Sequence, residues 1–384
     1  MPHNDIAVFA PAAACLYERE QEVTGGAERQ ATFLARGLAQ QGLRVAHIVL
    51  PVRDPDPGIP DELNLVQREL AFGGRGPGAR VRQLARVWGA LREADAATYV
   101  FRSGIPALGI GALFCRLHRR RLVFAASNDL DFTFDFYEGR GPELKLYRFG
   151  ARSATAIVVQ NRRQAALARK EFPAVTRIEE IPSFAERAEA ASESPCAFLW
   201  VGRLDAYKQP ARYIELAEAL PEARFWMIVR QLDPARSGGS PGGDSDPTLE
   251  RECIERASAL SNLSILEQRP HAEAMELVSR AVAVVNTGAA EGMPNLFLEA
   301  WARGVPVLSY EFDPDGRIAE NGLGTAAGGS FGAFRAAARE QWESRADRSG
   351  VSARTRAYVE ATHGLDAVTT RWRALISELG GEAR

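Results

Sequence analysis

Two glutamates eight positions apart, Glu291 and Glu299, enclose a turn that contains a glycine and a proline. A strand-like apolar run at 281–287 precedes the pair, and a helix-compatible run at 296–303 follows. Strand, glycine-bearing turn and helix form the unit that presents backbone N–H groups to a phosphate. We therefore expect Glu291 in the turn, at a ligand. Glu299 is expected on the helix, where it could meet a ribose diol.

A second motif joins a strand to two cations. The apolar run 198–201 leads into Gly202, then Arg203 and, five residues later, Lys208. Glycine lets the backbone turn without a Cβ penalty. The planar fork of arginine and the point charge of lysine can together hold two adjacent phosphates. Only three of the 47 basic residues are lysines, so a lysine here stands out. The alternative, a solvated lysine at a helix start, is disfavoured because helix starts prefer anions.

A glycine pair, Gly25-Gly26, lies near the N-terminus between a strand at 6–10 and an amphipathic helix at about 28–41. Glycines that open a helix let a ligand approach the backbone closely. Taken alone, the pair is equally well explained as an ordinary loop.

These motifs resemble those of retaining glycosyltransferases of family 4, which have the GT-B fold. The stretch 291–299 is similar to the E-x7-E signature of that family, and 202–208 is similar to its G-R-x4-K motif. The resemblance implies that Arg203 and Lys208 neutralise a departing diphosphate. It also implies that Gly25 and Gly26 face the cleft between two domains.

The resemblance further implies a division of the site into a donor side and an acceptor side. Catalysis is expected from Glu291, Arg203, Lys208 and Asp129. The acceptor side is expected to hold Asp129, Asp131 and Arg102. The donor-binding residues are expected to be Gly25, Gly26, Gly202, Arg203, Lys208, Glu291, Gly292, Met293, Pro294, Asn295, Leu296 and Glu299.

The chain departs from the family pattern in two places. Many members carry a histidine in the loop after the strand that ends here at Ala126, whereas this chain has Ser127-Asn128-Asp129-Leu130-Asp131. The strand that ends at Val229 usually runs into a glycine, but Arg230 and Gln231 follow here. The first departure concerns the acceptor side and the second concerns the nucleotide pocket.

The pair Asp129 and Asp131 has the spacing of a metal-binding D-x-D motif. The two aspartates lie in the first domain, which the resemblance identifies as the acceptor side. We therefore expect no metal at the leaving group. Either carboxylate could orient an acceptor hydroxyl, or serve as a helix cap or loop carboxylate. No cofactor is expected beyond a nucleotide-diphosphate sugar as co-substrate.

Strands and helices alternate in both halves, which predicts an α/β protein with two doubly wound, Rossmann-like parallel-sheet domains. We place the first, acceptor-side domain at 1–185, joined by the C-terminal helix 365–384. The second, nucleotide-sugar-binding domain is placed at 190–360. The predicted strands beyond the motifs are 44–50, 98–102, 121–126, 156–160, 223–229, 263–266 and 305–309, and the predicted helices include 79–94, 106–118, 141–152, 162–171 and 211–220.

Composition limits the class of protein. The 384 residues suggest two domains, and a net charge of −2 argues against a nucleic-acid binder. No apolar run is long enough to span a membrane as a helix. The cysteines fit no metal spacing and are typical of reduced thiols in a cytoplasmic protein; they are Cys15, Cys115, Cys196 and Cys253.

A basic cluster at 116–121 follows an apolar helix segment. It is explained either as a solvated helix end favoured by the macrodipole or as a peripheral contact with anionic lipid at the inner membrane face. A row of arginines at 80–92 has the same two explanations.

The expected reaction is transfer of a sugar, with retention, from a UDP- or GDP-type donor to a hydroxyl of a glycan, lipid-linked or small-molecule acceptor. Two alternatives remain. One is a nucleotide-sugar epimerase with the same fold, and the other is a non-catalytic nucleotide-sugar-binding subunit.

Overall fold

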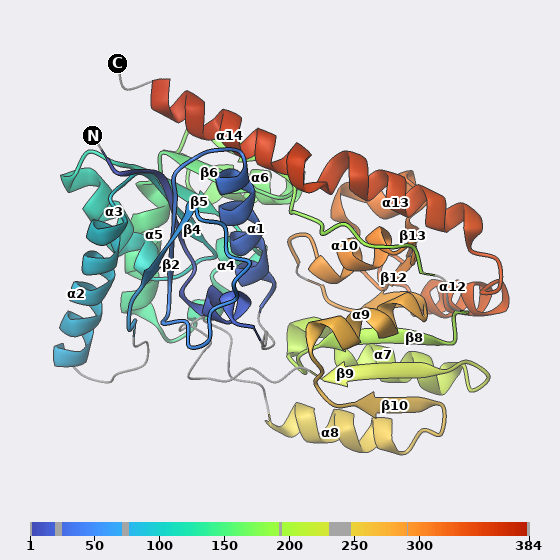
Figure 1. The fold of residues 1–384 in the computed structure, drawn as a ribbon. Helices are drawn as coiled ribbons and strands as arrows, with labels where there is room; N and C mark the ends of the chain where they lie inside the picture. The colour runs from blue at the N-terminus through green and yellow to red at the C-terminus, as the bar shows by residue number, and fades with distance from the viewer. Residues whose placement is uncertain are drawn as a thin grey trace. The chain divides into compact units, whose positions relative to one another are not determined.

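The computed structural model describes residues 2–19, 25–70, 77–191, 194–229, 247–289 and 291–381. They fall into two compact units, and each is built on one parallel sheet (Figure 1). Unit 1 runs from the N-terminus to Phe184 and takes up the C-terminal helix from Leu365 onward. Unit 2 holds the described residues between Ala185 and Gly364.

Unit 1 contains a seven-stranded sheet in the order β3-β2-β1-β4-β5-β6-β7, with every pairing parallel. The order reverses direction between β1 and β4, which are neighbours in the sheet. Such a switch point leaves a crevice at the carboxyl ends of the two strands. The strands are β1 Asn4–Phe9, β2 Val45–Val49, β3 Leu63–Gln67, β4 Ala96–Arg102, β5 Arg121–Ala125, β6 Ala156–Val159 and β7 Ile178–Glu180.

Helices cover both faces of this sheet. Because side chains alternate along a strand, Phe9 packs into one apolar core and Val8 into the other. The C-terminal helix contributes Val368 and Trp372 to the second of these cores. The helices are α1 Gly26–Gln40, α2 Pro77–Ala94, α3 Ala107–Leu117, α4 Leu130–Thr133, α5 Gly141–Arg152, α6 Arg162–Glu171 and α14 Leu365–Gly381, with 3-10 turns η1 Pro11–Tyr17 and η2 Asp135–Tyr137.

Unit 2 repeats this architecture with a six-stranded parallel sheet in the order β10-β9-β8-β11-β12-β13. Its strands are β8 Ala197–Gly202, β9 Phe225–Val229, β10 Leu263–Leu266, β11 Ala281–Asn286, β12 Val307–Ser309 and β13 Gly324–Ala326. Its helices are α7 Pro210–Ala219, α8 Pro247–Ser258, α9 His271–Ser279, α10 Asn295–Ala302, α11 Arg317–Glu320, α12 Phe331–Glu343 and α13 Ser349–His363, with 3-10 turns η3 Ala206–Lys208 and η4 Pro314–Gly316.

The switch point of unit 2 lies between β8 and β11. Phe198 and Trp200 of β8 enter one core, and Leu199 enters the core on the opposite face. The strands are apolar on both faces, as expected of a parallel sheet covered by helices. The fold class predicted from the sequence, two Rossmann-like parallel-sheet domains, is therefore confirmed.

Three strands, β3, β7 and β13, were not predicted. They are edge strands of three to five residues, and none is apolar and buried throughout. A continuous apolar run, the signal that identifies a central strand, is therefore missing. The sequence departure at Arg230 and Gln231 lies outside the described residues. Among the described helices, none has the length and apolar character needed to cross a membrane.

Candidate functional site

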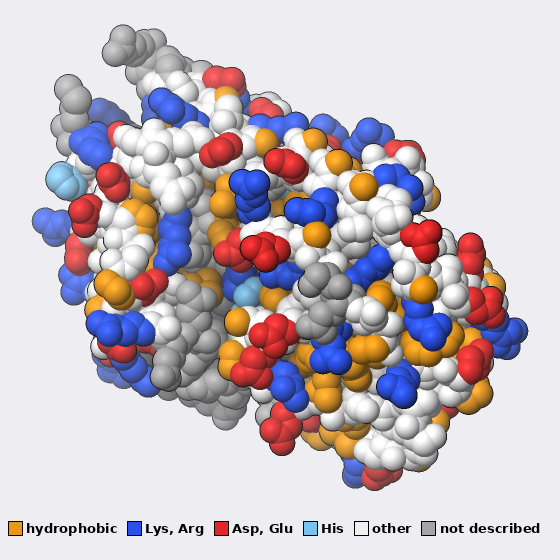
Figure 2. All heavy atoms as spheres, turned by 45° about the vertical axis from the view of Figure 1, so that its right-hand side comes forward, with side chains coloured by type: hydrophobic (Ala, Val, Ile, Leu, Met, Phe, Trp, Pro, Cys, Tyr) orange, Lys and Arg blue, Asp and Glu red, His pale blue; other side chains and the backbone are white. Residues whose placement is uncertain are grey.

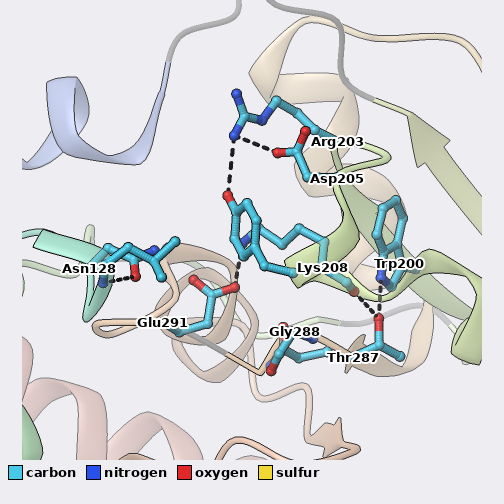
Figure 3. Close-up of polar contacts among 11 residues, drawn as sticks. Asn128, Trp200, Arg203, Asp205, Lys208, Thr287, Gly288 and Glu291 are labelled. Atoms are coloured by element: carbon cyan, nitrogen blue, oxygen red, sulfur yellow. Dashed lines mark hydrogen bonds and ion pairs between the residues drawn. The ribbon is translucent and has the colours of Figure 1, made fainter. Parts of the chain in front are cut away.

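The two sequence motifs of unit 2 meet at its switch point. Gly202 ends β8 and Asn286 ends β11, and the two strands are neighbours in the sheet. The loops that follow are joined through Thr287, whose hydroxyl donates to the carbonyl of Lys208 at 2.6 Å and accepts from Trp200 Nε1 at 3.0 Å (Figure 3). One buried hydroxyl thus fixes the loop that carries the lysine to the loop that carries Glu291.

The central interaction of the site is an ion pair between Lys208 and Glu291 (Figure 3). The lysine side chain is 23 % exposed and the glutamate side chain 9 %. Burial alone would lower the pKa of Lys208, but the adjacent carboxylate outweighs it and the net pKa is raised. The lysine is therefore firmly cationic. Its ammonium also lies 5.1 Å from the centroid of the Tyr207 ring, a favourable cation–π arrangement.

Arg203 has its own partners in the same loop. Its guanidinium pairs with Asp205 at 2.5 Å and donates to the Tyr207 hydroxyl at 3.2 Å. Burial raises the pKa of Asp205, and the charges of Arg203 and Lys208 draw it back part of the way. Together with the Lys208–Glu291 pair, these four charged side chains carry two positive and two negative charges, so the group is formally neutral.

The backbone of Gly288 lies close to the Lys208–Glu291 ion pair. A Cβ atom at this position would lie 3.0 Å from Glu291 Oε1 and 3.6 Å from Lys208 Cδ. A side chain would therefore press on the ion pair. The backbone N–H of the next residue, Ala289, donates to the carbonyl of Tyr207 at 3.1 Å, which adds a second link between the loops.

The helix expected after the turn is α10, with Pro294 at its N-cap and Asn295 as its first residue. Proline has no N–H, so the backbone donors at this helix start come from Asn295 onward. Glu299 lies on α10, 3.7 Å from Nε2 of His271 at the start of α9. Its side chain is 18 % exposed, so it is accessible from the surface of unit 2.

Five residues of this site were not predicted: Asp205, Tyr207, Thr287, Gly288 and His271. The first two lie inside the 202–208 motif, where a polar residue between two cations was a usable signal. The next two directly follow β11, and residues that follow a strand of a parallel sheet lie at the ligand-binding edge. His271 had no sequence signal, because its proximity to Glu299 depends on how α9 packs beside α10.

The other five predicted residues lie in unit 1, and three of them are Gly25, Gly26 and Arg102. Gly25 is the N-cap of α1 and Gly26 its first residue, so the glycine pair does open the helix. Arg102 ends β4 at the switch point of this unit. Burial lowers the pKa of Arg102 to about 10, while the carboxylates of Asp131 and Glu28 act to raise it. A cation and two carboxylates therefore gather at the carboxyl edge of the unit 1 sheet.

Asp131 has a structural role. It is 5 % exposed and accepts from the backbone N–H groups of Gly104 at 2.8 Å, Ser127 at 2.7 Å and Asn128 at 3.2 Å. Burial raises the pKa of Asp131, and these donors oppose the shift. Its carboxylate joins the loop after β4 to the loop after β5. These contacts do not support the expectation that it orients an acceptor hydroxyl.

Asp129 is also enclosed. It is 1 % exposed and pairs with Arg163 Nε of α6 at 2.9 Å. It stands at the N-cap of α4 but makes no side-chain capping bond, so the capping explanation fails. The D-x-D spacing therefore marks two enclosed carboxylates with separate protein partners. Within the described ranges, no three His, Cys, Asp or Glu side chains gather as metal ligands would.

The chain was compared with known families and structures. Residues 25–183, within unit 1, match the model of a family described as a glycosyl transferase 4-like domain. A comparison with curated protein sequences gives no match.

Several solved structures share the fold. Sucrose-phosphate synthase from Thermosynechococcus elongatus is 15 % identical, with a TM-score of 0.76 over 99 % of this chain and 100 % of that one. WaaG, a glycosyltransferase involved in lipopolysaccharide biosynthesis, is 18 % identical, with a TM-score of 0.68 over 97 % of this chain and 99 % of its own. Anabaena HepE in complex with UDP-glucose is 14 % identical, with a TM-score of 0.70 over 98 % of this chain and 100 % of that one.

Identities of this size establish the fold. Residues 25–183 are therefore similar to a glycosyl transferase 4-like domain, and the whole chain has the GT-B fold. The resemblance to glycosyltransferase family 4 that the motifs indicated is confirmed. Because one fold serves many activities, the reaction has to be argued from the site.

Proposed function

We propose that this chain is a retaining, metal-independent glycosyltransferase. It transfers a sugar from a UDP- or GDP-type donor to a hydroxyl of a glycan, lipid-linked or small-molecule acceptor. The observation that carries the proposal is the placement of Arg203 and Lys208 on one loop at the switch point of unit 2. The fold of HepE, whose structure contains UDP-glucose, supports a nucleotide-sugar donor.

The chemistry follows from charge. When the anomeric C–O bond breaks, the departing diphosphate gains negative charge, and fixed cations stabilise that state more than the ground state. Arg203 and Lys208 supply the charge. The backbone N–H groups of Asn295 and Leu296, in the first turn of α10, add the positive end of a helix dipole. Glu299, further along that helix, is placed to accept hydrogen bonds from the ribose.

Donor binding requires an exchange of partners. Both cations already have carboxylate partners, Arg203 with Asp205 and Lys208 with Glu291. A diphosphate that binds to them must weaken these pairs. Once Lys208 turns to the phosphate, Glu291 can accept a hydrogen bond from a hydroxyl of the transferred sugar. The glutamate then holds the ring while oxocarbenium charge develops beside it.

The acceptor side belongs to unit 1 in this proposal, near Arg102. We place the protein in the cytoplasm, where nucleotide sugars serve as donors. An epimerase would convert the donor without an acceptor, and a non-catalytic subunit would bind it without conversion.

Binding and turnover separate these possibilities. We expect UDP or GDP, and the matching nucleotide sugar, to raise the melting temperature of the full chain. A ligand at 100 times its Kd adds about 2.7 kcal/mol of stability. We also expect slow donor hydrolysis, faster when an acceptor is present, with the anomeric configuration of the donor retained. Stabilisation without any turnover would support the non-catalytic subunit, and an epimerised donor would support the epimerase. A chain that binds no nucleotide diphosphate would contradict all three.

A further inference from the structure

One stretch of unit 1 is almost free of acidic residues. Residues 70–128 contain ten arginines but only two acids, Glu93 and Asp95, in a chain whose net charge is −2. Both acids are already ion-paired, Glu93 with Arg68 and Asp95 with Arg120. Over the face drawn in Figure 2, acidic and basic side chains are intermixed. The stretch 70–128, which includes α2 and α3, therefore carries a strong excess of positive charge.

The same two helices expose large apolar side chains. On α2, Val81 is 63 % exposed and Leu84 43 %; on α3, Leu113 is 47 % exposed and Leu117 65 %. Within the described part of the chain, four of the six large hydrophobic residues that are exposed to this degree lie on these two helices. Single exposed leucines are ordinary on a protein surface, but a group on adjacent helices is not.

The two helices pack against each other. Trp88 of α2 contacts the rings of Phe114 and His118 of α3, with centroids 5.1 and 5.8 Å apart. Residues three or four apart share a helix face. Leu84 is therefore one turn from Trp88 on its side of α2, and Leu117 lies on the side of α3 that carries Phe114. The half-buried tryptophan thus connects the two apolar groups.

The same two helices carry exposed arginines: Arg82 and Arg86 on α2, and Arg116 and Arg119 at the end of α3. We call the four apolar residues and these four arginines the α2–α3 face. Apolar side chains that enter the headgroup boundary, surrounded by cations that meet anionic headgroups, are the two components of peripheral membrane binding. We propose that the α2–α3 face docks on an anionic lipid surface.

The combination of charge and apolar area identifies the occupant. A soluble polyanion would be held by the arginines but would gain nothing from the exposed valine and leucines. A bilayer uses both groups of side chains. This inference does not depend on the proposed reaction, because it concerns residues outside the site of unit 2.

The test is co-sedimentation of the full chain with vesicles. We expect binding to vesicles of phosphatidylglycerol and phosphatidylethanolamine in equal parts, and at least tenfold weaker binding to phosphatidylcholine alone. Leu113→Ser/Leu117→Ser and Arg116→Gln/Arg119→Gln should each weaken binding to the anionic vesicles at least tenfold. Matched controls lie on α8, where Ile254 is 39 % exposed and Arg251 is exposed. Ile254→Ser and Arg251→Gln should bind as the original chain does.

Circular dichroism and an unchanged thermal unfolding transition show that each variant is folded. The proposal is overturned if the folded chain does not bind anionic vesicles, or if the α8 variants lose as much binding as the α2–α3 variants. Binding that needs the arginines but not the leucines, and that a soluble polyanion such as heparin removes, would identify a polyanionic partner in place of a membrane.

Discussion

Lys208 and Glu291, which are 83 positions apart, form an ion pair at the carboxyl ends of two neighbouring strands. The cation that the motif assigns to the diphosphate and the carboxylate that it assigns to the sugar are therefore direct partners in the unliganded chain. The two residues are coupled: removing either one changes the charge that the other presents to a donor.

Replacing Lys208 with alanine should lower turnover at least a hundredfold while the protein stays folded. The reason is the loss of one fixed cation at the leaving group, and a single contact of this kind typically contributes about 3 to 4 kcal/mol. Lys170→Ala is the matched control, since that lysine is exposed on α6. Steady-state kinetics on both variants is the measurement. Near-normal transfer by folded Lys208→Ala protein would contradict the diphosphate assignment.

Glu291→Gln should mainly impair turnover, whereas Glu299→Gln should mainly impair nucleotide binding. Loss of Glu299 should weaken both free nucleotide diphosphate and nucleotide sugar, by about tenfold or 1.4 kcal/mol. Loss of Glu291 removes the carboxylate that competes for Lys208, so free nucleotide diphosphate should bind as well as before or more tightly. Turnover should fall because the sugar is no longer held.

Isothermal titration with nucleotide diphosphate distinguishes the two glutamates. If Glu291→Gln weakens the free nucleotide as much as Glu299→Gln does, the division of roles is incorrect.

Thr287→Val should destabilise the protein by about 1 to 3 kcal/mol, because it leaves Trp200 Nε1 and the carbonyl of Lys208 without the hydroxyl that now joins them. Turnover should fall as well, since the lysine loop is no longer held to β11. Thr287→Ser keeps the hydroxyl and is the control. Denaturant unfolding of the pair tests this, and equal stability of the valine and serine variants would rule the bridging role out.

The Lys208–Glu291 pair also predicts a pH effect. The folded pKa of Lys208 is raised above its ordinary 10.5. Its charge, and the stability that the pair contributes, should therefore persist at alkaline pH and disappear only as pH rises through that folded value. In Glu291→Gln the carboxylate is gone, while burial and the nearby Arg203 still lower the pKa. Nucleotide diphosphate binding by this variant should weaken at a lower pH than in the original chain. Titrations over a pH series would show it, and superimposable profiles would exclude it.

Activity should survive excess chelator. Arg203 and Lys208 already provide the positive charge that a metal would supply, and the two aspartates with D-x-D spacing are enclosed by protein partners. The measurement is transfer in EDTA with and without added Mg²⁺ or Mn²⁺. A loss that either metal restores would show that the leaving group needs an ion.

Much of the unit 2 site could be predicted because its residues are contiguous in sequence. Gly202, Arg203 and Lys208 occupy one loop, and the turn from Glu291 into α10 is another. A strand that ends in a glycine and leads into a helix has one local geometry, so the edge on which these side chains lie follows from the pattern. The acceptor side had no such local signal, and Asp129 and Asp131 were assigned there from the family resemblance.

The sequence by itself determined the two Rossmann-like sheets, the positions of both motifs and the identity of the cations, because each depends on hydrophobic runs and turn residues close together in the chain. Only the tertiary structure decided which carboxylates accompany those cations. Thr287 and Gly288 reach Lys208 because β8 and β11 are adjacent at the switch point, and Asp131 is enclosed because the loops after β4 and β5 close over it. Burial and pairing of a charge depend on neighbours far away in the chain, and residue type and spacing do not specify them.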